Sequence, residues 1–311
     1  MNIEAPIEEK EFSQSESILN LPLQCAVEDA ATLSLADFNR KYFIPQKPVL
    51  LKGLANMQPA GQKWTIDWFK QTMGHLDIKV FDNTRKQHVY STTVQPDFSM
   101  KFEEFLDIIA CNEPSTVRMF RYDLYKQNPA LKKDFSCPHI FNQGPFKNLG
   151  FMFLGGKDTD VRLHYDVDYS NVLLTQIYGR KRVILYPPDQ SKFLYQVPFN
   201  THSLADLKHP EKWPNLKYAK GYEIIQEAGD GIFMPSGYWH YNTYLTGGIS
   251  VAYRKMANTP KRFIKGATFM GFTLPFDKTV NFFFSEKWFA YKEKLCKIRN
   301  QKAVEASVLK N

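Results

Sequence analysis

The sequence has few cysteines, no long hydrophobic run and no hydrophobic leader. Its 311 residues include four cysteines, which lie far apart and form no C-x-x-C pair. This spacing excludes the common zinc and thiol-exchange motifs and argues against a disulfide framework. No segment approaches the roughly 18 consecutive apolar residues of a membrane span. The acidic start, MNIEAPIEEKEFSQSES, lacks the basic-then-apolar order of a signal peptide. We therefore expect a cytoplasmic protein with no membrane-spanning segment.

The net charge of +8 belongs to one end of the chain. Residues 255–311 contain 12 Lys or Arg against 4 Asp or Glu, whereas the residues before them contain 28 of each sign. Residues 1–31 carry seven acids and one Lys. The basic excess predicts either a solvated helix face or a surface for an acidic partner such as RNA. It carries no information about the body of the protein.

The hydrophobic pattern divides the chain into three parts. Residues 1–31 are polar and aperiodic, and we expect a flexible or loosely docked tail. Residues 32–257 form the compact domain, and 258–311 form a basic helical segment. From about residue 115 to 257, short apolar or alternating runs are separated by Gly, Pro, Asp or Asn, as is typical of an antiparallel sandwich or barrel. The polar stretch 187–222 predicts a long insertion loop.

Helices and strands alternate before residue 115. Ser34 and Thr65 are expected to cap short helices, and Ser99 precedes the helical pattern KFEEFLDIIA. Three further runs predict strands: 47–54, 77–82 and 88–94.

The last part of the chain predicts a long helix that Ser285 can cap. Its apolar side chains recur at spacings of three and four and form one stripe, namely Trp288, Tyr291, Leu295 and Ile298. The stripe predicts packing either against the protein's own barrel or across a dimer seam.

The segment RLHYDVD contains the sharpest chemical signal. His164 and Asp166 are two residues apart in a strand-like run, so both side chains should leave the same face. An imidazole beside a carboxylate provides two ligands for iron, manganese or zinc. A chance H-x-D pair is common, and a surface pair or a structural histidine is the alternative.

A third ligand is available downstream, in EAGDGIFMPSGYWHYNTYL. His240 follows a Gly-Asp turn, a strand and a Pro-Ser-Gly turn, and a late strand of a closed sheet commonly lies beside an early one. His240 could therefore face His164 and Asp166. Two histidines and one carboxylate leave three metal positions open, as in non-heme iron(II) oxygenases.

Two cations could bind an acidic cosubstrate beside this metal. Lys181 begins the strand GRKRVILYPP, and Arg254 lies in ISVAYRK. An oxygenase that uses 2-oxoglutarate needs a fixed cation for the distal carboxylate, while the 2-oxo acid end chelates iron. The residues alone leave open which of the two serves.

The ordered motifs resemble a known family. H-Y-D at 164–166, the block QIYGRKRVILYPPDQSKFLY and the segment GYEIIQEAGDGIFMPSGYWH, which ends at His240, look like the JmjC-type cupin oxygenases. The resemblance is strongest to the subgroup that contains an asparaginyl hydroxylase and a tRNA wybutosine hydroxylase, and it covers most of residues 35–256. It implies a mainly β fold, a double-stranded β-helix (jelly roll), with N-terminal α/β elements and a C-terminal helical segment.

The resemblance also implies the site. His164, Asp166 and His240 match the iron(II) ligands, and Lys181 matches the lysine that binds 2-oxoglutarate. O₂ is the other cosubstrate. Three further positions are implied less directly as cosubstrate contacts: Tyr122, Asn171 and Arg254. This chain has two extra residues between His164 and Gly179, which makes the match of Asn171 approximate, and Arg254 stands where the asparaginyl hydroxylase has Asn.

The implied activity is a 2-oxoglutarate-dependent hydroxylase that acts on a protein side chain. A modified tRNA base is the second substrate class, a small metabolite is the third, and hydroxylation at an N-linked carbon would give demethylation. The alternative of another class is a non-catalytic metal-binding module. Because relatives pair through C-terminal helices, the resemblance favours a homodimer.

Overall fold

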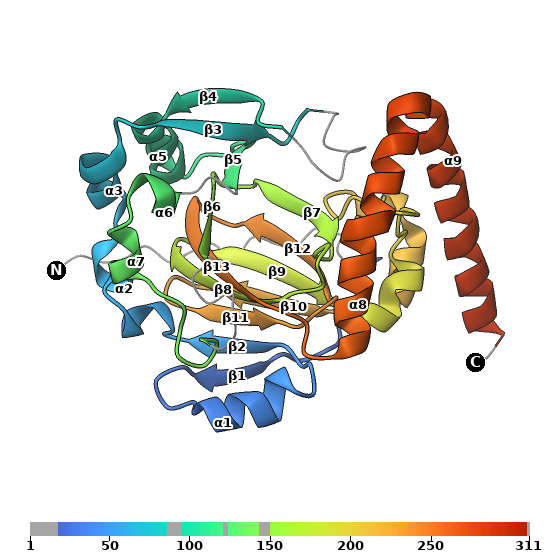
Figure 1. Ribbon diagram of the computed structural model, residues 1–311, viewed down its shortest axis with the longest axis horizontal. Coiled ribbons are helices and arrows are strands. Elements are labelled where there is room, and N and C mark those ends of the chain that lie inside the picture. The colour runs from blue at the N-terminus through green and yellow to red at the C-terminus, as the bar shows by residue number, and fades with distance from the viewer. Residues whose placement is uncertain (1–17, 86–94, 121–123, 143–149, 310–311) are drawn as a thin grey trace.

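Two β-sheets, one of nine strands and one of four, pack face to face (Figure 1). The computed structural model describes residues 18–85, 95–120, 124–142 and 150–309. In spatial order, the larger sheet contains β1 (Ala26–Asp29), β2 (Val49–Lys52), β11 (Gly231–Met234), β8 (Asn171–Tyr178), β13 (Gly248–Lys255), β6 (Gly150–Gly155), β5 (Val117–Phe120), β3 (Asp77–Asp82) and β4 (Phe98–Lys101). The smaller contains β10 (Tyr222–Gln226), β9 (Lys181–Tyr186), β12 (Trp239–Tyr244) and β7 (Asp160–His164). The mainly β jelly-roll fold expected from the sequence is confirmed.

Strand β8 shows why the central strands have almost continuous hydrophobic sequences. Val172 and Leu174 point between the two sheets, where they meet Val183 of β9. Leu173 and Ile177 point to the opposite face, where helices cover the larger sheet. Both faces of β8 are therefore buried, so alternation with polar residues is lost.

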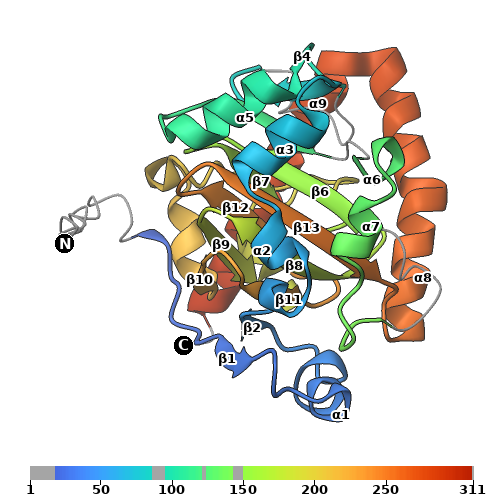
Figure 2. The same cartoon turned by 90° about the vertical axis from the view of Figure 1, so that its left-hand side faces the viewer.

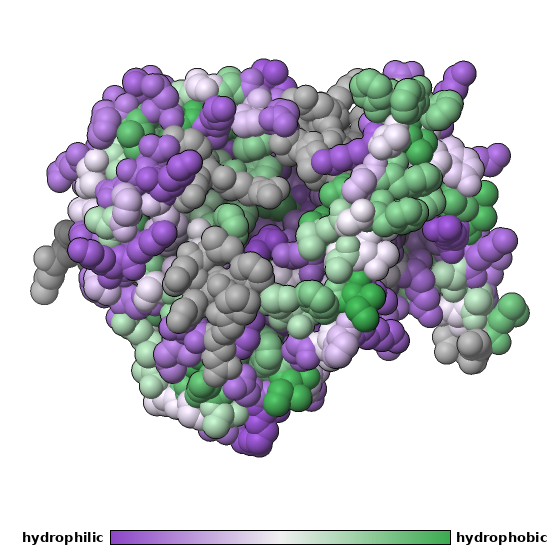
Figure 3. Space-filling model, in the orientation of Figure 1, coloured by the Kyte–Doolittle hydropathy of each residue, from purple (hydrophilic) through white to green (hydrophobic). Residues whose placement is uncertain are grey.

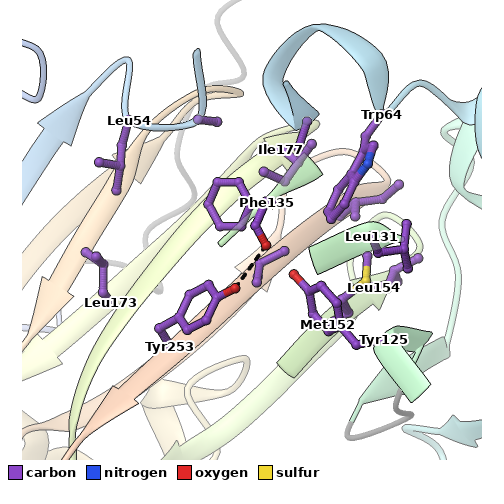
Figure 4. Packing of buried hydrophobic residues seen from close by; sticks show 14 of the residues in the cluster. Leu54, Trp64, Tyr125, Leu131, Phe135, Met152, Leu154, Leu173, Ile177 and Tyr253 are labelled. Atoms are coloured by element: carbon purple, nitrogen blue, oxygen red, sulfur yellow. Dashed lines mark hydrogen bonds between the residues drawn. The ribbon is translucent and has the colours of Figure 1, made fainter. Parts of the chain in front are cut away.

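Helices from the first half of the chain cover the outer face of the larger sheet (Figure 2). They are α1 (Leu35–Phe38), α2 (Ala60–Lys63), α3 (Ile66–Met73), α5 (Phe102–Cys111), α6 (Leu124–Gln127) and α7 (Leu131–Asp134), with the short turns η2 (Asn39–Phe43) and η3 (Ala55–Met57). Figure 4 shows the packing, in which Tyr253 of β13 donates a hydrogen bond to the Phe135 carbonyl at 3.0 Å and Trp64 approaches Phe135.

The first half also tests the expected helix caps and strands. The side chains of Ser34 and Thr65 accept the backbone N–H of Asp37 and Trp68, so both predicted caps are confirmed. The residue that precedes α5 is Lys101, because Ser99 lies within β4. Two of the predicted strands are confirmed as β2 and β3, and 88–94 lies outside the described residues.

Part of the segment that the sequence placed in an N-terminal tail is a strand. Residues 26–29 form β1, which pairs in parallel with β2. Three of its four side chains are exposed, so the pairing uses backbone hydrogen bonds and leaves no hydrophobic period in the sequence.

The 187–222 loop covers the outer face of the smaller sheet. It folds as three 3₁₀ turns, η4 (Pro188–Phe193), η5 (Pro210–Lys212) and η6 (Pro214–Tyr218). Phe193, Leu194 and Leu216 pack there against Ile184 and Tyr186 of β9. The loop is therefore part of the hydrophobic core.

The C-terminal segment forms α8 (Pro260–Thr268), η7 (Phe269–Thr273) and α9 (Leu274–Val308). At Ser285 (φ 36°, ψ −108°) the chain reverses, so α9 has two arms that lie side by side (Figure 1). Asp277 joins the arms because it accepts hydrogen bonds from Lys292 at 2.7 Å and Trp288 at 2.8 Å. Among the described residues, no helix combines the length and apolar character needed to cross a membrane.

The buried face of the second arm differs from the predicted stripe. Cys296 and Val304 pack against the 187–222 loop, whereas Tyr291 and Ile298 are 54% and 42% exposed. Packing against the protein's own domain is thus confirmed, but through another face. The polar Asn300 belongs to this buried face and donates a hydrogen bond to the Lys192 carbonyl. Because one of its buried residues is polar, this face does not appear as a stripe in the hydrophobic pattern of the sequence.

Candidate metal centre

The three predicted metal ligands lie together at one end of the smaller sheet. His164 ends β7 and is the direct antiparallel partner of His240 on β12. Asp166 follows in the turn after β7, and ligand atoms of all three residues lie within 4.8 Å of one another. The turn, rather than a continuing strand, brings Asp166 to this position. Two imidazoles and a carboxylate form a donor set that fits iron(II), manganese(II) or zinc(II).

Backbone carbonyls orient both imidazoles for metal binding. Nδ1 of His164 lies 2.7 Å from the Arg162 carbonyl, and Nδ1 of His240 lies 3.2 Å from the Tyr238 carbonyl. Since a carbonyl only accepts, each Nδ1 carries the proton and each Nε2 keeps its lone pair. Burial lowers the pKa of both histidines, and neighbouring His240 lowers that of His164 further. Both rings are therefore neutral near pH 7.

Arg254 contacts the metal ligand Asp166 directly. Its guanidinium donates to Oδ1 of Asp166 at 2.8 Å and lies 3.4 Å from Oδ2 of Asp168. These two carboxylates already compensate its charge, and the contact orients Asp166.

Lys181 is a buried cation in the same cavity. It is 2% exposed, donates to Oγ of Ser250 at 2.6 Å and lies 4.2 Å from the ring centroid of Tyr244. Burial lowers its pKa to about 7. Within the part of the chain that the structure describes, no carboxylate forms an ion pair with it. Such a group favours an anionic ligand, because a buried charge is costly without a partner.

Strand register separates Lys181 from the metal ligands. On β9 and β12, Lys181 pairs with Tyr244 and Leu185 pairs with His240, so four residues separate the two levels. Four residues correspond to roughly 13 Å along a strand, so Lys181 and the candidate ligands lie at two separate levels of one cavity.

Of the other two cosubstrate contacts implied by the resemblance, only Asn171 is among the described residues. Asn171 points away from the cavity: Oδ1 accepts from Gln46 and from the Ser236 N–H, at 2.9 and 3.0 Å, and Nδ2 donates to the Met256 carbonyl at 3.0 Å. It shares the outward face of β8 with Leu173 and is not among the cavity-lining residues. Tyr122 lies outside the described residues.

The cavity has a volume of about 1140 Å³ and extends beyond the ligands. Among the residues that the structure describes, its wall carries eight Lys or Arg and four Asp, and Phe263 and Met270 from α8 and η7 flank one side. Figure 3 shows hydrophobic surface over α8 and the adjoining arm of α9, next to a hydrophilic hollow.

The sequence analysis did not single out several polar residues of this wall, among them Arg118, Arg162, His202 and Asn242. Arg162 and Asn242 lie two residues from His164 and His240 along the same strands, so a period of two was the signal that could have indicated them. His202 lies in the 187–222 loop, which has no periodicity to show its direction.

Comparisons with known proteins identify the family of the chain. A family model for the cupin-like domain matches residues 35–287. The tRNA wybutosine-synthesizing protein 5 of Gallus gallus is 30% identical over 224 residues, which cover 65% of this chain and 68% of that protein. Jumonji C domain-containing protein 5 of Drosophila melanogaster is 27% identical over 243 residues, covering 73% and 59%. Lysine-specific demethylase 8 of Xenopus tropicalis is 27% identical over 231 residues, covering 71% and 50%. The chain therefore belongs to the cupin-like family, among its JmjC members of the oxygenase type.

Proposed function

We propose that the protein is an iron(II)- and 2-oxoglutarate-dependent hydroxylase. The observation that carries the proposal is Lys181, a buried cation without an acidic partner among the described residues, which faces the same cavity as the metal ligands. Lys181 would bind the distal carboxylate of 2-oxoglutarate. Arg254 is the weaker candidate for this role because Asp166 and Asp168 already compensate its charge.

The residues of the chain position and shield the reactants. His164, Asp166 and His240 would hold iron(II) by one face and leave the other face open to the cavity. When iron(II), 2-oxoglutarate and O₂ are bound, they supply the oxidation of a substrate C–H bond, with release of succinate and carbon dioxide. Val172, Leu174 and other apolar side chains of the inner strands keep water from the cosubstrate.

A protein side chain is the proposed substrate class, and a modified tRNA base is the second. Relatives support each class by name, since one is named a lysine-specific demethylase and another a tRNA wybutosine-synthesizing protein. The basic C-terminal segment gives the RNA substrate class some support, because a basic surface attracts nucleic acid. The support is modest because these Lys and Arg side chains lie mostly on α8 and α9.

The exposed aromatic side chains of the C-terminal helices support the proposal of a homodimer. Phe272, Phe282, Phe283 and Phe284 are 69%, 83%, 70% and 60% exposed. Large exposed apolar side chains that gather on neighbouring elements, here η7 and α9, commonly mark an interaction site. We propose that a second copy of the chain covers this surface. Two observations support this partner: Tyr291 and Ile298 of the predicted apolar stripe are exposed, and the family resemblance favours a homodimer.

An anaerobic visible spectrum tests the proposed function. Protein reconstituted with iron(II) and 2-oxoglutarate should show a weak metal-to-ligand charge-transfer band that Asp166→Ala abolishes. A matched control, Asp206→Ala, removes another acid of the cavity wall and should keep the band. If the fully metallated wild-type protein shows no band, the protein is a non-catalytic binding module.

A further inference from the structure

The cavity continues past the metal ligands into a polar region that the proposed cosubstrate site does not use. Arg162 lies two residues before His164 on β7, and Asn242 lies two residues after His240 on β12. The β7–β12 pairing is irregular between His240 and Asn242, so alternation alone does not fix the direction of Arg162, but both side chains line the same cavity as the ligands. Arg118 of β5 lines the same space. We refer to the region lined by Arg118, Arg162, His202 and Asn242 as the cationic arm.

The charge of Arg118 is not compensated by an ion pair with any carboxylate in the described ranges. Its Nε donates to Oδ1 of Asn83 at 2.7 Å, and its Cζ lies 4.6 Å from the ring centroid of Phe120. The neighbouring acid, Asp160, forms an ion pair with Lys208 at 2.8 Å and accepts from Nδ2 of Asn83 at 3.0 Å. Asp160 is therefore already engaged.

Arg162 adds a second positive charge to the same cavity. Arg118 comes from β5 and Arg162 from β7, and both half-buried side chains line the same cavity. Two guanidinium groups in one cavity repel each other, and a bound anion relieves that repulsion.

His202 presents an acceptor to the same region. Oδ1 of Asn200 accepts the His202 backbone N–H at 3.1 Å, so it is an oxygen, and it lies 2.8 Å from Nδ1 of His202. Nδ1 therefore carries the proton, which leaves the Nε2 lone pair free to accept a hydrogen bond. The ring stacks on His164 at a centroid distance of 5.3 Å, directly beside the metal ligands.

Asn242 has an unsatisfied polar atom in this wall. The residue is 7% exposed, and its Oδ1 is buried without a hydrogen-bond partner. Buried polar atoms are nearly always satisfied, and an exception in a cavity wall is explained when a ligand completes it. The cationic arm thus combines two cations with two acceptors.

We propose that the cationic arm is the substrate subsite and binds a small anionic group, a carboxylate or a phosphate, that the substrate carries close to its oxidised carbon. The inference deepens the proposed function and rests on it. Iron(II) and the 2-oxoglutarate dianion would cancel each other's charge, so neither would neutralise Arg118, which forms no ion pair with a described carboxylate and lines the cavity. The acceptors His202 and Asn242 would bind N–H or O–H groups next to the anion.

Calorimetry on the full chain tests the subsite, with manganese(II) replacing iron so that no turnover occurs. Protein loaded with manganese(II) and 2-oxoglutarate is titrated with three probes. They are N-acetyl-aspartate N-methylamide, its neutral isostere N-acetyl-asparagine N-methylamide, and inorganic phosphate. We expect at least one anionic probe to bind at least tenfold more tightly than the neutral one, and the tighter anion identifies a carboxylate or a phosphate as the recognised group.

Variants then test whether the preference for the anionic probe depends on the cationic arm. Arg162→Gln and Arg118→Gln should each remove it, Arg162→Lys should keep part of it, and the exposed Lys220→Gln, outside the cavity, should keep all of it. 2-Oxoglutarate affinity, measured on the same samples, should change less than threefold, which also controls for folding.

The outcomes separate this inference from the proposed function. Equal affinity for charged and neutral probes, or no binding of either, overturns the subsite. A tenfold loss of 2-oxoglutarate affinity in Arg162→Gln also overturns it, because the arginine then serves the cosubstrate. If wild-type protein binds no 2-oxoglutarate but retains the arginine-dependent preference, the proposed function fails and the anion site stands.

Discussion

Replacing Lys181 with methionine should abolish tight cosubstrate binding without unfolding the protein. Methionine has a similar length and volume, so it fills the space between Ser250 and Tyr244. The substitution removes the only property that the proposed function needs from this residue, its positive charge.

The expected loss of affinity is about 100-fold. A hydrogen bond to a charged group contributes about 1.5–3 kcal/mol, and leaving a buried charge unpaired costs about 3–5 kcal/mol. We take a loss of about 3 kcal/mol of binding free energy. Since about 1.4 kcal/mol corresponds to a factor of ten in Kd, this loss corresponds to about 100-fold.

Whereas Lys181→Met should weaken cosubstrate binding, it should not lower the free energy of unfolding. Burial lowers the Lys181 pKa from 10.5 to about 7, so the unfolded chain holds this proton between pH 7 and 10.5 while the folded chain releases it. The wild-type free energy of unfolding therefore rises with pH through this window. Below pH 7 the buried ammonium costs the wild-type protein roughly 2–5 kcal/mol. Lys181→Met, which lacks this cost, should be at least as stable there.

The same pKa predicts how cosubstrate binding depends on pH. The bound carboxylate requires the ammonium form, so wild-type affinity should fall above pH 7 by up to tenfold per pH unit. The ligand histidines, whose pKa values are already lowered, are neutral throughout this range. The profile of Lys181→Met should be flat.

Isothermal titration calorimetry with manganese(II) between pH 6.5 and 9, together with urea unfolding, measures both effects. A Kd for Lys181→Met within threefold of the wild-type value would refute the assignment and favour Arg254 as the clamp. Strong destabilisation below pH 7 would refute the argument that the ammonium is unpaired.

The other predictions concern the metal, Arg254, Asn171 and the C-terminal helices. Asp166→Ala should weaken manganese(II) binding at least 100-fold by calorimetry, because one of three protein ligands is lost, and unchanged binding would contradict the site. Arg254→Met should lower metal affinity while 2-oxoglutarate Kd stays within threefold, because Arg254 orients Asp166; a large change in that Kd would restore Arg254 as the clamp. Asn171→Ala should cost about 1–3 kcal/mol in urea unfolding, because it strands buried hydrogen-bonding groups, without altering 2-oxoglutarate Kd. Phe283→Glu with Ile298→Glu should halve the mass in light scattering at unchanged melting temperature, and an unchanged mass would argue against a dimer through this face.

Local patterns determined the triad and most of the strands. The H-x-D spacing indicated His164 and Asp166, although β7 ends at His164 and the segment after it, rather than strand alternation, brings Asp166 into place. The turn before β12 indicated where His240 would lie, and in the structure His164 and His240 are direct partners across two strands. The strands and turns could be predicted because their residue patterns are local properties of the backbone.

The position of Asn171 could not be predicted from the resemblance to the family. Even-numbered residues of β8, such as Val172 and Leu174, face the cavity, whereas Asn171 faces outward with Leu173. A shift of one residue in a strand exchanges its two faces. The two extra residues after His164 made that register ambiguous in the sequence.

The sequence by itself determined the fold class, the buried strands and the candidate ligands His164, Asp166 and His240, because each was recognised from a period or a motif within a few residues. Only the tertiary structure decided that Lys181 lacks an acidic partner while Arg254 has two. It also decided that the second arm of α9 buries Cys296 rather than Ile298, and that Arg118, from a distant strand, lines the same cavity as Arg162. These contacts join elements that lie far apart in the sequence, and a local sequence pattern does not specify which distant elements pack together.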